Sequence, residues 1–413
     1  MNRRTFFKSL ALAPAATLAR PGTAAAELPK AKITRVRIYR PPNVNPLFNQ
    51  STMVATVETD AGITGIGEGG SKDTLEQCAG SLIGKNPFHT EAIWQEMYIS
   101  WFYPPGREKA HALGALDLAL WDIKGKALGV PVHELLGGTA RDYCECYATG
   151  GARPPGVAPD ARLSLKERAR ATMEAGYRAF RMAPADPPIG GVYDTRAIVR
   201  QVAQDCRDVR EAVGADGNWC IDFHQRFDFN DALRLCKAIE EYDPFFVEDP
   251  VRDENALQDI PKLRQMTTVA LTHGEEWGHR WDFNKLVENH DVDFVRSTLP
   301  NVGGITELMK AAAICETHAV GIIPHFTGPI ATAALVHCLS TFSGPVLMEY
   351  NYGGRPIDYL PECLDFKNGK AYTNQRPGLG VTADLTRLTQ IGEVTEPGRR
   401  NVYKRPDGSL THW

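Results

Sequence analysis

Short apolar segments alternate with amphipathic segments along the chain after Gly138. In the amphipathic segments apolar residues recur every three to four positions, which is the period of a helix with one buried face. Strands that alternate with helices predict parallel βαβ units, and eight such strands are the number that closes a (β/α)8 barrel. The predicted strands lie within residues 146–151, 179–184, 218–224, 245–250, 269–275, 293–298, 321–326 and 346–350, and the predicted helices include 164–176, 195–213, 230–242, 280–289, 304–318 and 329–340. We therefore expect an α/β protein with a TIM-type barrel.

The first part of the chain has a different pattern. Residues 30–70 contain three β-type runs with a turn at Asp60–Gly62, which predicts a three-stranded meander. A helical period follows through Lys126, and Gly129 ends it. A chain of 413 residues is long enough for one large and one smaller domain. The expected division is an α+β domain over 27–140, the barrel over 141–375, and a loop-like segment over 376–413 that packs back on the first domain.

Three acidic residues recur at nearly one spacing in the predicted barrel. Asp222, Glu248 and Glu275 are 26 and 27 residues apart, and each stands where an apolar run ends. This spacing is the length of one strand-plus-helix unit, so the three carboxylates would converge at one end of successive parallel strands. Each would be costly to bury alone, and a hard divalent cation resolves their repulsion. The pattern predicts a metal site, most simply for Mg²⁺.

The charge and the cysteines narrow the class further. The formal net charge is −4 and there is no basic cluster, so we expect no nucleic-acid partner and no polybasic membrane patch. No segment is long and apolar enough to predict a membrane span. The nine cysteines lack zinc-type spacing, and most fall inside periodic segments where a buried thiol is expected.

The N-terminus has the pattern of an export signal. Arg3 and Arg4 precede a short apolar stretch, and Ala24–Ala26 end it. This combination predicts a twin-arginine signal peptide over residues 1–26 and a periplasmic or exported mature protein. A disordered basic tail is the alternative.

Several longer motifs stand out along the chain. They are ALDLALWDIKGKALGVPVHELLGG (115–138), DFHQRF (222–227), FVEDP (246–250), GEEWGHRWDF (274–283), NVGGITE (301–307) and IIPHFTGPI (322–330). The chain resembles the enolase superfamily, and within it the galactonate-type sugar-acid dehydratases of the mandelate racemase group. The resemblance implies an α+β capping domain over a modified TIM barrel, and an essential Mg²⁺.

The resemblance assigns roles to individual residues. Asp222, Glu248 and Glu275 match the three metal ligands, although Glu276 could stand in place of Glu275. His325 matches the general base at the end of the seventh strand, with a buried, hydrogen-bonded histidine as the alternative. His224 matches the histidine that protonates the departing hydroxyl, with a spectator that only lines the pocket as the alternative. It stands two residues after a strand-end ligand, and strand alternation would turn it to the same face.

Three positions depart from the family pattern. Arg181 stands where racemases and cycloisomerases carry lysines, and an arginine suits holding a carboxylate or hydroxyl better than acting as a base. Thr298 stands where an aspartate normally pairs with the catalytic histidine, so the orientation and basicity of His325 depend on other groups. Glu349 lies near the acidic position that the family has on the eighth strand. Its carboxylate could be a proton donor, a hydrogen-bonding group at the enediolate, or part of a structural ion pair.

These residues lead to one expected function and two alternatives. We expect Mg²⁺-dependent dehydration of an aldonate-type sugar acid to a 2-keto-3-deoxy acid through an enediolate, by a hydro-lyase that is homo-oligomeric. The alternatives are a racemase, epimerase or lactone cycloisomerase using the same enediolate, or an inactive exported protein that binds sugar acids. We expect Asn43, Asn45 and Phe48, in the loop between the first two strands, to lie near the substrate, with an ordinary polar loop as the alternative. Trp277 and Tyr350 are expected to line the substrate pocket, with a packing role as the alternative.

Overall fold

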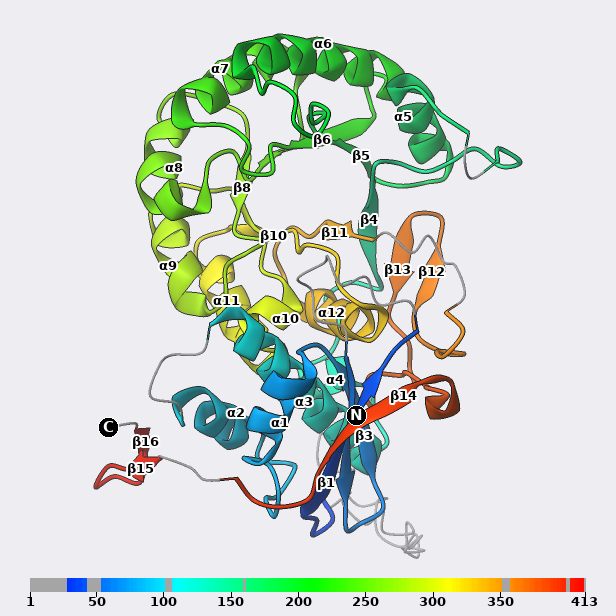
Figure 1. Cartoon of the computed structure of the whole chain (residues 1–413), viewed down its shortest axis with the longest axis vertical. Helices are drawn as coiled ribbons and strands as arrows, with labels where there is room; N and C mark the ends of the chain where they lie inside the picture. The colour runs from blue at the N-terminus through cyan, green and yellow to red at the C-terminus, as the bar shows by residue number, and fades with distance from the viewer. Residues whose placement is uncertain are drawn as a thin grey trace, which may run out of the picture.

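The computed structural model describes residues 28–42, 53–100, 106–158, 161–350, 357–398 and 402–411. A closed ring of strands surrounded by helices stands beside a smaller sheet-and-helix unit (Figure 1). These are the barrel and the capping domain that the sequence predicts. Among the described residues, no helix is long and apolar enough to cross a membrane.

Eight parallel strands form the barrel. Each strand from β4 to β9 pairs with the next one along the chain, and β11 pairs with β4. A bridge between Ile322 and Val346 joins β10 to the segment leading into β11, which closes the ring. The strands are β4 (Tyr143–Thr149), β5 (Ala179–Met182), β6 (Asn218–Asp222), β7 (Val247–Glu248), β8 (Leu271–His273), β9 (Phe294–Val295), β10 (Gly321–Ile322) and β11 (Met348–Glu349).

Helices cover the outside of the barrel strands (Figure 1). They are α5 (Leu165–Glu174), α6 (Thr195–Val213), α7 (Phe229–Ile239), α8 (Ala256–Arg264), α9 (Arg280–Glu288), α10 (Leu299–Val302), α11 (Ile305–Thr317) and α12 (Pro329–Thr341). The sequence analysis did not predict α8, which carries Pro261 inside it and so contradicts the usual helix pattern. The described residues after β11 form a hairpin, β12 (Asp365–Lys367) and β13 (Lys370–Tyr372), that extends β4 antiparallel.

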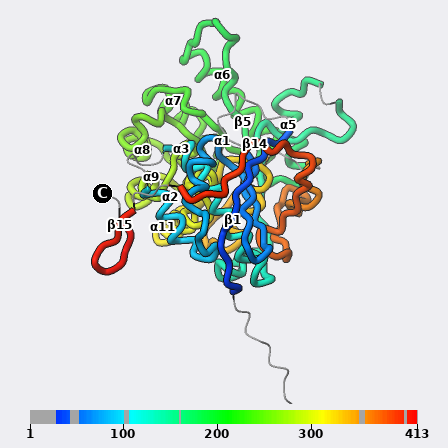
Figure 2. Tube along the Cα trace, turned by 60° about the horizontal axis from the view of Figure 1, so that its bottom comes forward, coloured from blue at the N-terminus to red at the C-terminus, as the bar shows by residue number. Residues whose placement is uncertain are grey.

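The capping domain combines both ends of the chain. Its antiparallel sheet has the order β14 (Thr389–Val394), β1 (Ile33–Arg40), β2 (Val54–Thr59), β3 (Thr64–Glu68). Figure 2 shows β14 lying beside β1, with Val394 opposite Val36. The helices of this part of the chain are α1 (Lys72–Ala79), α2 (Thr90–Ile99), α3 (Arg107–Leu128) and the linker helix α4 (Val132–Leu135). Near the C-terminus, a 3-10 turn at Leu385–Arg387 precedes β14, and β15 (Tyr403–Lys404) and β16 (Leu410–Thr411) form a hairpin. Two further 3-10 turns, Glu240–Tyr242 and Asp253–Asn255, belong to the barrel.

Buried carboxylates of the cap hold two barrel helices by their N-terminal N–H groups. Glu68 at the end of β3 accepts from Ile330 N at 2.8 Å and Ala331 N at 3.0 Å, in the first turn of α12. Asp117 in α3 accepts from Thr306 N at 2.9 Å in the first turn of α11. Burial raises the pKa of both carboxyl groups to about 7. Anions are favoured at helix N-termini, so these contacts fix the cap against the loops that follow β9 and β10.

Candidate active site

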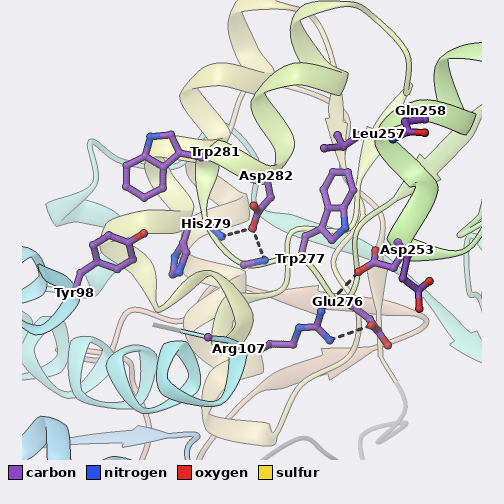
Figure 3. A pocket seen from close by; sticks show the side chains of 13 residues that line it. Tyr98, Arg107, Asp253, Leu257, Gln258, Glu276, Trp277, His279, Trp281 and Asp282 are labelled. Atoms are coloured by element: carbon purple, nitrogen blue, oxygen red, sulfur yellow. Dashed lines mark hydrogen bonds and ion pairs between the residues drawn. The ribbon is translucent and has the colours of Figure 1, made fainter. Parts of the chain in front are cut away.

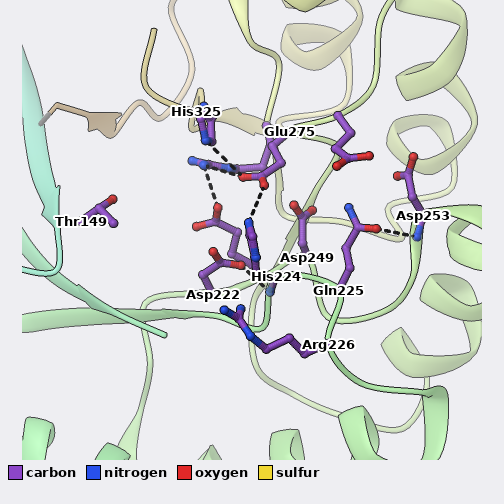
Figure 4. Close-up of polar contacts among 12 residues, drawn as sticks. Thr149, Asp222, His224, Gln225, Arg226, Asp249, Asp253, Glu275 and His325 are labelled. Atoms are coloured by element: carbon purple, nitrogen blue, oxygen red, sulfur yellow. Dashed lines mark hydrogen bonds and ion pairs between the residues drawn. The ribbon is translucent and has the colours of Figure 1, made fainter. Parts of the chain in front are cut away.

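The structure gathers the predicted site residues at the carboxyl end of the barrel, and Figure 4 shows Asp222, His224, Glu275 and His325 close together there. Asp222, Glu248 and Glu349 are the last residues of β6, β7 and β11, and Arg181 lies in β5. Glu275 follows β8 by two residues, and His325 follows β10 by three. Apart from the two histidines, these side chains are buried or nearly so, with exposures of 9% or less. The strands themselves therefore position most of the site.

Two buried guanidinium groups hold the carboxylates together. Arg181 pairs with Asp222 and lies 3.5 Å from Glu248, measured from Nε to Oε2. Arg296 Nη2 lies 2.7 Å from Glu248 Oε1, 3.2 Å from Glu275 Oε2 and 2.9 Å from Glu349 Oε2. The chemistry of a guanidinium predicted that Arg181 holds a carboxylate or hydroxyl, and in the structure the carboxylates beside it are those of Asp222 and Glu248.

Arg296 was missed by the sequence analysis. It lies just after β9, inside the apolar run DFVRST, and it is fully buried. Its Nη1 also donates to the Tyr147 hydroxyl at 2.6 Å and to the carbonyl of Ile323 at 3.1 Å. A charged residue inside an apolar strand was the available signal, because buried arginines require partners.

The open carboxyl end of the barrel, called the mouth from here on, carries more acidic than basic side chains. Four carboxylates, those of Asp222, Glu248, Glu275 and Glu349, face two guanidinium groups, so full ionisation of the four would leave an excess equal to one divalent cation. Burial, together with the neighbouring acids, raises the pKa of Glu248 and Glu275 to about 8 despite the arginines. Burial also raises the pKa of Asp222 well above its usual range. Carboxyl groups whose ionised form is this costly are ones that a bound cation would stabilise.

Glu349 behaves differently from the other three carboxylates. Burial would raise its pKa, but Arg181, His325 and Arg296 outweigh that effect and lower it. Thr149 Oγ1 donates to one of its oxygens, and the Phe326 amide donates to the other at 3.1 Å. This carboxylate is held ionised in a structural network, which is one of the alternatives that the sequence left open and argues against a proton donor.

Ligand atoms for a hard cation are present. Oxygens of Glu248, Asp249 and Glu275 lie within 4.8 Å of one another. Glu248 Oε2 and Asp249 Oδ2 are buried and make no hydrogen bond to the described residues. Asp222 is not in this compact group, since Arg181 engages one of its oxygens and the His224 amide donates to the other at 2.6 Å. Buried oxygens that lack donors are what a hard cation binds, so the residues fit Mg²⁺.

Asp249 was not singled out by the sequence analysis. It pairs with the buried His273, whose Nδ1 lies 2.9 Å from Asp249 Oδ1 and whose Nε2 lies 3.1 Å from Asp253 Oδ1. Burial alone would lower the pKa of His273, but the two aspartates raise it to about 9. The imidazolium thus neutralises Asp249 and occupies one of its two carboxylate oxygens.

His325 is oriented by the backbone. Its Nδ1 lies 2.7 Å from the Phe326 carbonyl, which can only accept, so Nδ1 carries the proton and Nε2 is the basic nitrogen. That Nε2 lies 3.9 Å from Glu275 Oε2. Burial, assisted by Arg296 and opposed by Glu349, lowers the pKa of His325 to about 4. Thr298 instead donates to the Arg296 carbonyl at 3.1 Å.

His224 lies on the other side of the Glu275 carboxylate, but strand alternation, which was the expected reason, does not place it there. Strand β6 ends at Asp222, and His224 lies in a turn with φ of 51°, so strand alternation does not apply to it. Its Nε2 nevertheless lies 3.6 Å from Glu275 Oε1, and the side chain is 56% exposed. Burial lowers its pKa, with Arg226 as the next cause.

The choice between the two adjacent glutamates follows from their contacts. Glu276 is half-exposed and pairs with Arg107 Nη1 of the cap at 3.0 Å, on the outside of the mouth. Glu275 faces both histidines. Glu276, Arg107 and Trp277 instead line a neighbouring hollow of about 740 Å³ between α2 and α9 (Figure 3).

The remaining expected substrate contacts are only partly described. Tyr350 packs on Phe366 with ring centroids 4.4 Å apart, and it is buried. Trp277 packs against the rings of His273 and Phe283. Both aromatic residues therefore have packing roles here. Asn43, Asn45 and Phe48 lie outside the described residues, as does the predicted signal at residues 1–26.

Comparisons with known proteins agree with this fold and site. Residues 34–137 match the N-terminal domain of the mandelate racemase / muconate lactonizing enzyme family, and residues 164–387 match the enolase C-terminal domain-like family. The chain therefore belongs to the mandelate racemase / muconate lactonizing enzyme family of the enolase superfamily, and it is an enzyme.

Individual relatives cover nearly the whole chain. A protein named D-galactonate dehydratase from Pectobacterium atrosepticum is 34% identical, with 92% of this chain and all of the relative covered. One of the same name from Ralstonia pickettii is 35% identical over the same shares. Among solved structures, an enolase superfamily member from Salmonella Typhimurium has a TM-score of 0.79 and 25% identity, covering 88% of this chain and all of that one.

Proposed function

We propose that the protein dehydrates an aldonate-type sugar acid to a 2-keto-3-deoxy acid in an Mg²⁺-dependent reaction. The observation that carries this proposal is the placement of two imidazoles on the two oxygens of one carboxylate. His224 Nε2 lies 3.6 Å from Glu275 Oε1, and His325 Nε2 lies 3.9 Å from Glu275 Oε2. A base and an acid on opposite sides of one metal ligand suit removal of a proton and of a hydroxyl from adjacent carbons. The names of the relatives support the same reaction.

Asp222, Glu248 and Glu275 would hold the cation. Bound there, Mg²⁺ would supply positive charge for the substrate carboxylate and acidify the C2 proton. Arg181 and Arg296 offset part of the cost of ionising the ligand carboxylates and hold them close together. Because both guanidinium groups are buried and paired, we assign them to charge balance at the site and not to substrate binding.

The two histidines would act in sequence on different atoms. His325, neutral because burial lowers its pKa, takes the C2 proton at Nε2 and so forms the enediolate. His224, which is half-exposed, gives a proton to the C3 hydroxyl as it leaves as water. Steps of this kind contribute about 10²–10⁴-fold each in rate.

A racemase or epimerase is the second candidate. It would need a second base across the substrate from His325, and β5 offers only Arg181 at that place. A guanidinium paired with Asp222 stays protonated, which disfavours this reading. An inactive sugar-acid-binding protein would keep the pocket without turnover.

Deuterium exchange separates the roles of the histidines. In D₂O with Mg²⁺, His325→Asn should abolish exchange of the C2 hydrogen, because the base is gone. His224→Asn should retain that exchange but lose dehydration, because only the acid is missing. Equal loss of exchange in both variants would contradict the division of roles.

Metal removal tests the site itself. Glu248→Gln keeps the shape of a buried ligand but removes its charge, so we expect no detectable Mg²⁺ binding by calorimetry and no turnover, with the circular dichroism spectrum unchanged. Turnover that survives in chelator, or normal binding by this variant, would show that the site is misassigned.

We also propose that the protein is exported through the twin-arginine route. All nine cysteines are free, which suits a chain that folds in a reducing compartment before export. N-terminal sequencing of the native protein should begin close to residue 27, and a mature cytoplasmic chain beginning at Met1 would refute the proposal.

A further inference from the structure

Glu275 is the one proposed ligand that no strand holds. Asp222 and Glu248 end β6 and β7, and their neighbours in the barrel fix them. Strand β8 ends at His273, and Gly274 then turns with φ of 103° before Glu275. A ligand on a turn needs support from elsewhere if its position is to be fixed.

That support comes from the capping domain. The side-chain amide of Asn301 in α10 donates from Nδ2 to the Glu275 carbonyl at 2.5 Å. Its Oδ1 is in turn hydrogen-bonded to His111 Nε2 of the cap helix α3. His111 and Asn301 are buried, with exposures of 3% and 7%. The three groups form a continuous chain from the cap to the backbone of the ligand.

The direction of these hydrogen bonds is fixed by chemistry. The Glu275 carbonyl can only accept, so the Asn301 side chain must present its N–H₂ to it and its oxygen to His111. His111 must then donate from Nε2. Burial lowers the pKa of His111 to about 4, so a neutral ring with its proton on Nε2 makes this contact.

We propose that His111 and Asn301 are positioning residues through which the docked cap fixes Glu275 and so sets the affinity of the site for Mg²⁺. This inference rests on the proposed function, because it takes Glu275 as a metal ligand. Outer-shell partners of metal ligands typically change metal affinity by about 10–100-fold when removed. The cap would thus do more than cover the mouth, since an undocked cap leaves the third ligand loose.

A second cap contact on the same turn provides a matched control. Arg107 pairs with Glu276 at 3.0 Å, next to Glu275 in sequence, but both side chains are more than 40% exposed. Exposed ion pairs contribute little, so breaking this one should leave the turn in place. Glu276→Gln therefore removes a cap contact from the same turn without touching the buried chain of hydrogen bonds.

The test is an Mg²⁺ titration of the metal-free protein by calorimetry, with hydrogen exchange of residues 274–278 measured before metal is added. Asn301→Ala removes both hydrogen bonds, His111→Phe removes the donor at similar size, and His111→Gln restores a donor. We expect Mg²⁺ affinity to fall at least tenfold in Asn301→Ala and His111→Phe, with faster exchange of the turn. His111→Gln and Glu276→Gln should stay within about threefold of the wild-type affinity.

Each outcome bears on one of the two proposals. If the wild-type protein binds no Mg²⁺, the proposed function fails before any variant is compared. If the wild-type protein binds Mg²⁺ and His111→Phe, His111→Gln and Glu276→Gln all bind it equally well, the positioning role is overturned. Should Asn301→Ala fail to fold, the comparison between the two His111 variants still decides the matter.

Discussion

At the scale of single residues, Arg296 carries, together with Arg181, the positive charge that balances the carboxylates of the site. Its guanidinium contacts Glu248, Glu275 and Glu349 from a fully buried position. Arg296→Met would leave buried carboxylates uncompensated, and breaking a buried pair in this way costs about 3–5 kcal/mol. Urea denaturation in chelator should show that loss.

A double variant provides the control for this prediction. Adding Glu349→Gln to Arg296→Met removes one of the uncompensated charges, so part of the lost stability should return. A loss below about 1 kcal/mol in Arg296→Met alone would contradict the role given to this residue.

The pH dependence of catalysis should report on His325. The base must be neutral, and an imidazole is neutral above its pKa, which is lowered to about 4 here. At saturating Mg²⁺, kcat/KM should therefore rise on a limb well below pH 6.5. Thr298→Asp adds a negative charge that favours the imidazolium, so the limb should move to higher pH. A wild-type limb near 6.5, or no movement in the variant, would refute this prediction.

The sequence predicted those residues of the site that strand ends position. Asp222 and Glu248 follow from spacing alone, because parallel strands bring their last residues to one edge. The choice of Glu275 over Glu276 needed their contacts. Arg296 and the His273–Asp249 pair were missed, since which charges meet inside a barrel depends on packing between distant strands.

At the scale of elements, the contact between α3 and α11 depends on a glycine. Gly304 has φ of 103°, and a Cβ there would lie 2.6 Å from Asp117 Oδ2. Gly304→Ala should cost at least about 2 kcal/mol, because it combines backbone strain with a clash at the cap. Gly62→Ala is the control, since its φ of 77° is strained but a Cβ would meet nothing within 4 Å. Thermal unfolding that shows equal losses in both variants would contradict this account of the interface.

Periodicity predicted most of the barrel elements but not their lengths. Helix α6 is amphipathic, and its pattern matched residues 195–213 directly. Four of the barrel strands are only two residues long, because the parallel pairing that defines them ends early. Helix α8 was missed, since Pro261 is a helix breaker in any reading of sequence alone.

At the scale of the whole molecule, the two domains form one catalytic unit. Strand β14 comes from the end of the chain and pairs with β1, over 350 residues earlier. Sequence could suggest that the C-terminal segment returns to the cap, but not which strand it joins, because that register depends on contacts distant in the chain. The same holds for the cap residues that reach Asn301 and the first turns of α11 and α12.

The central claim is that this mouth dehydrates a sugar acid with the help of Mg²⁺. The most direct test is proton NMR of an aldonate series, D-galactonate included, incubated with the protein and Mg²⁺ in D₂O. We predict a 2-keto-3-deoxy acid with one solvent deuterium at C3, formed only while Mg²⁺ is present. Exchange at C2 without loss of water, or turnover that is unchanged in chelator, would contradict the claim.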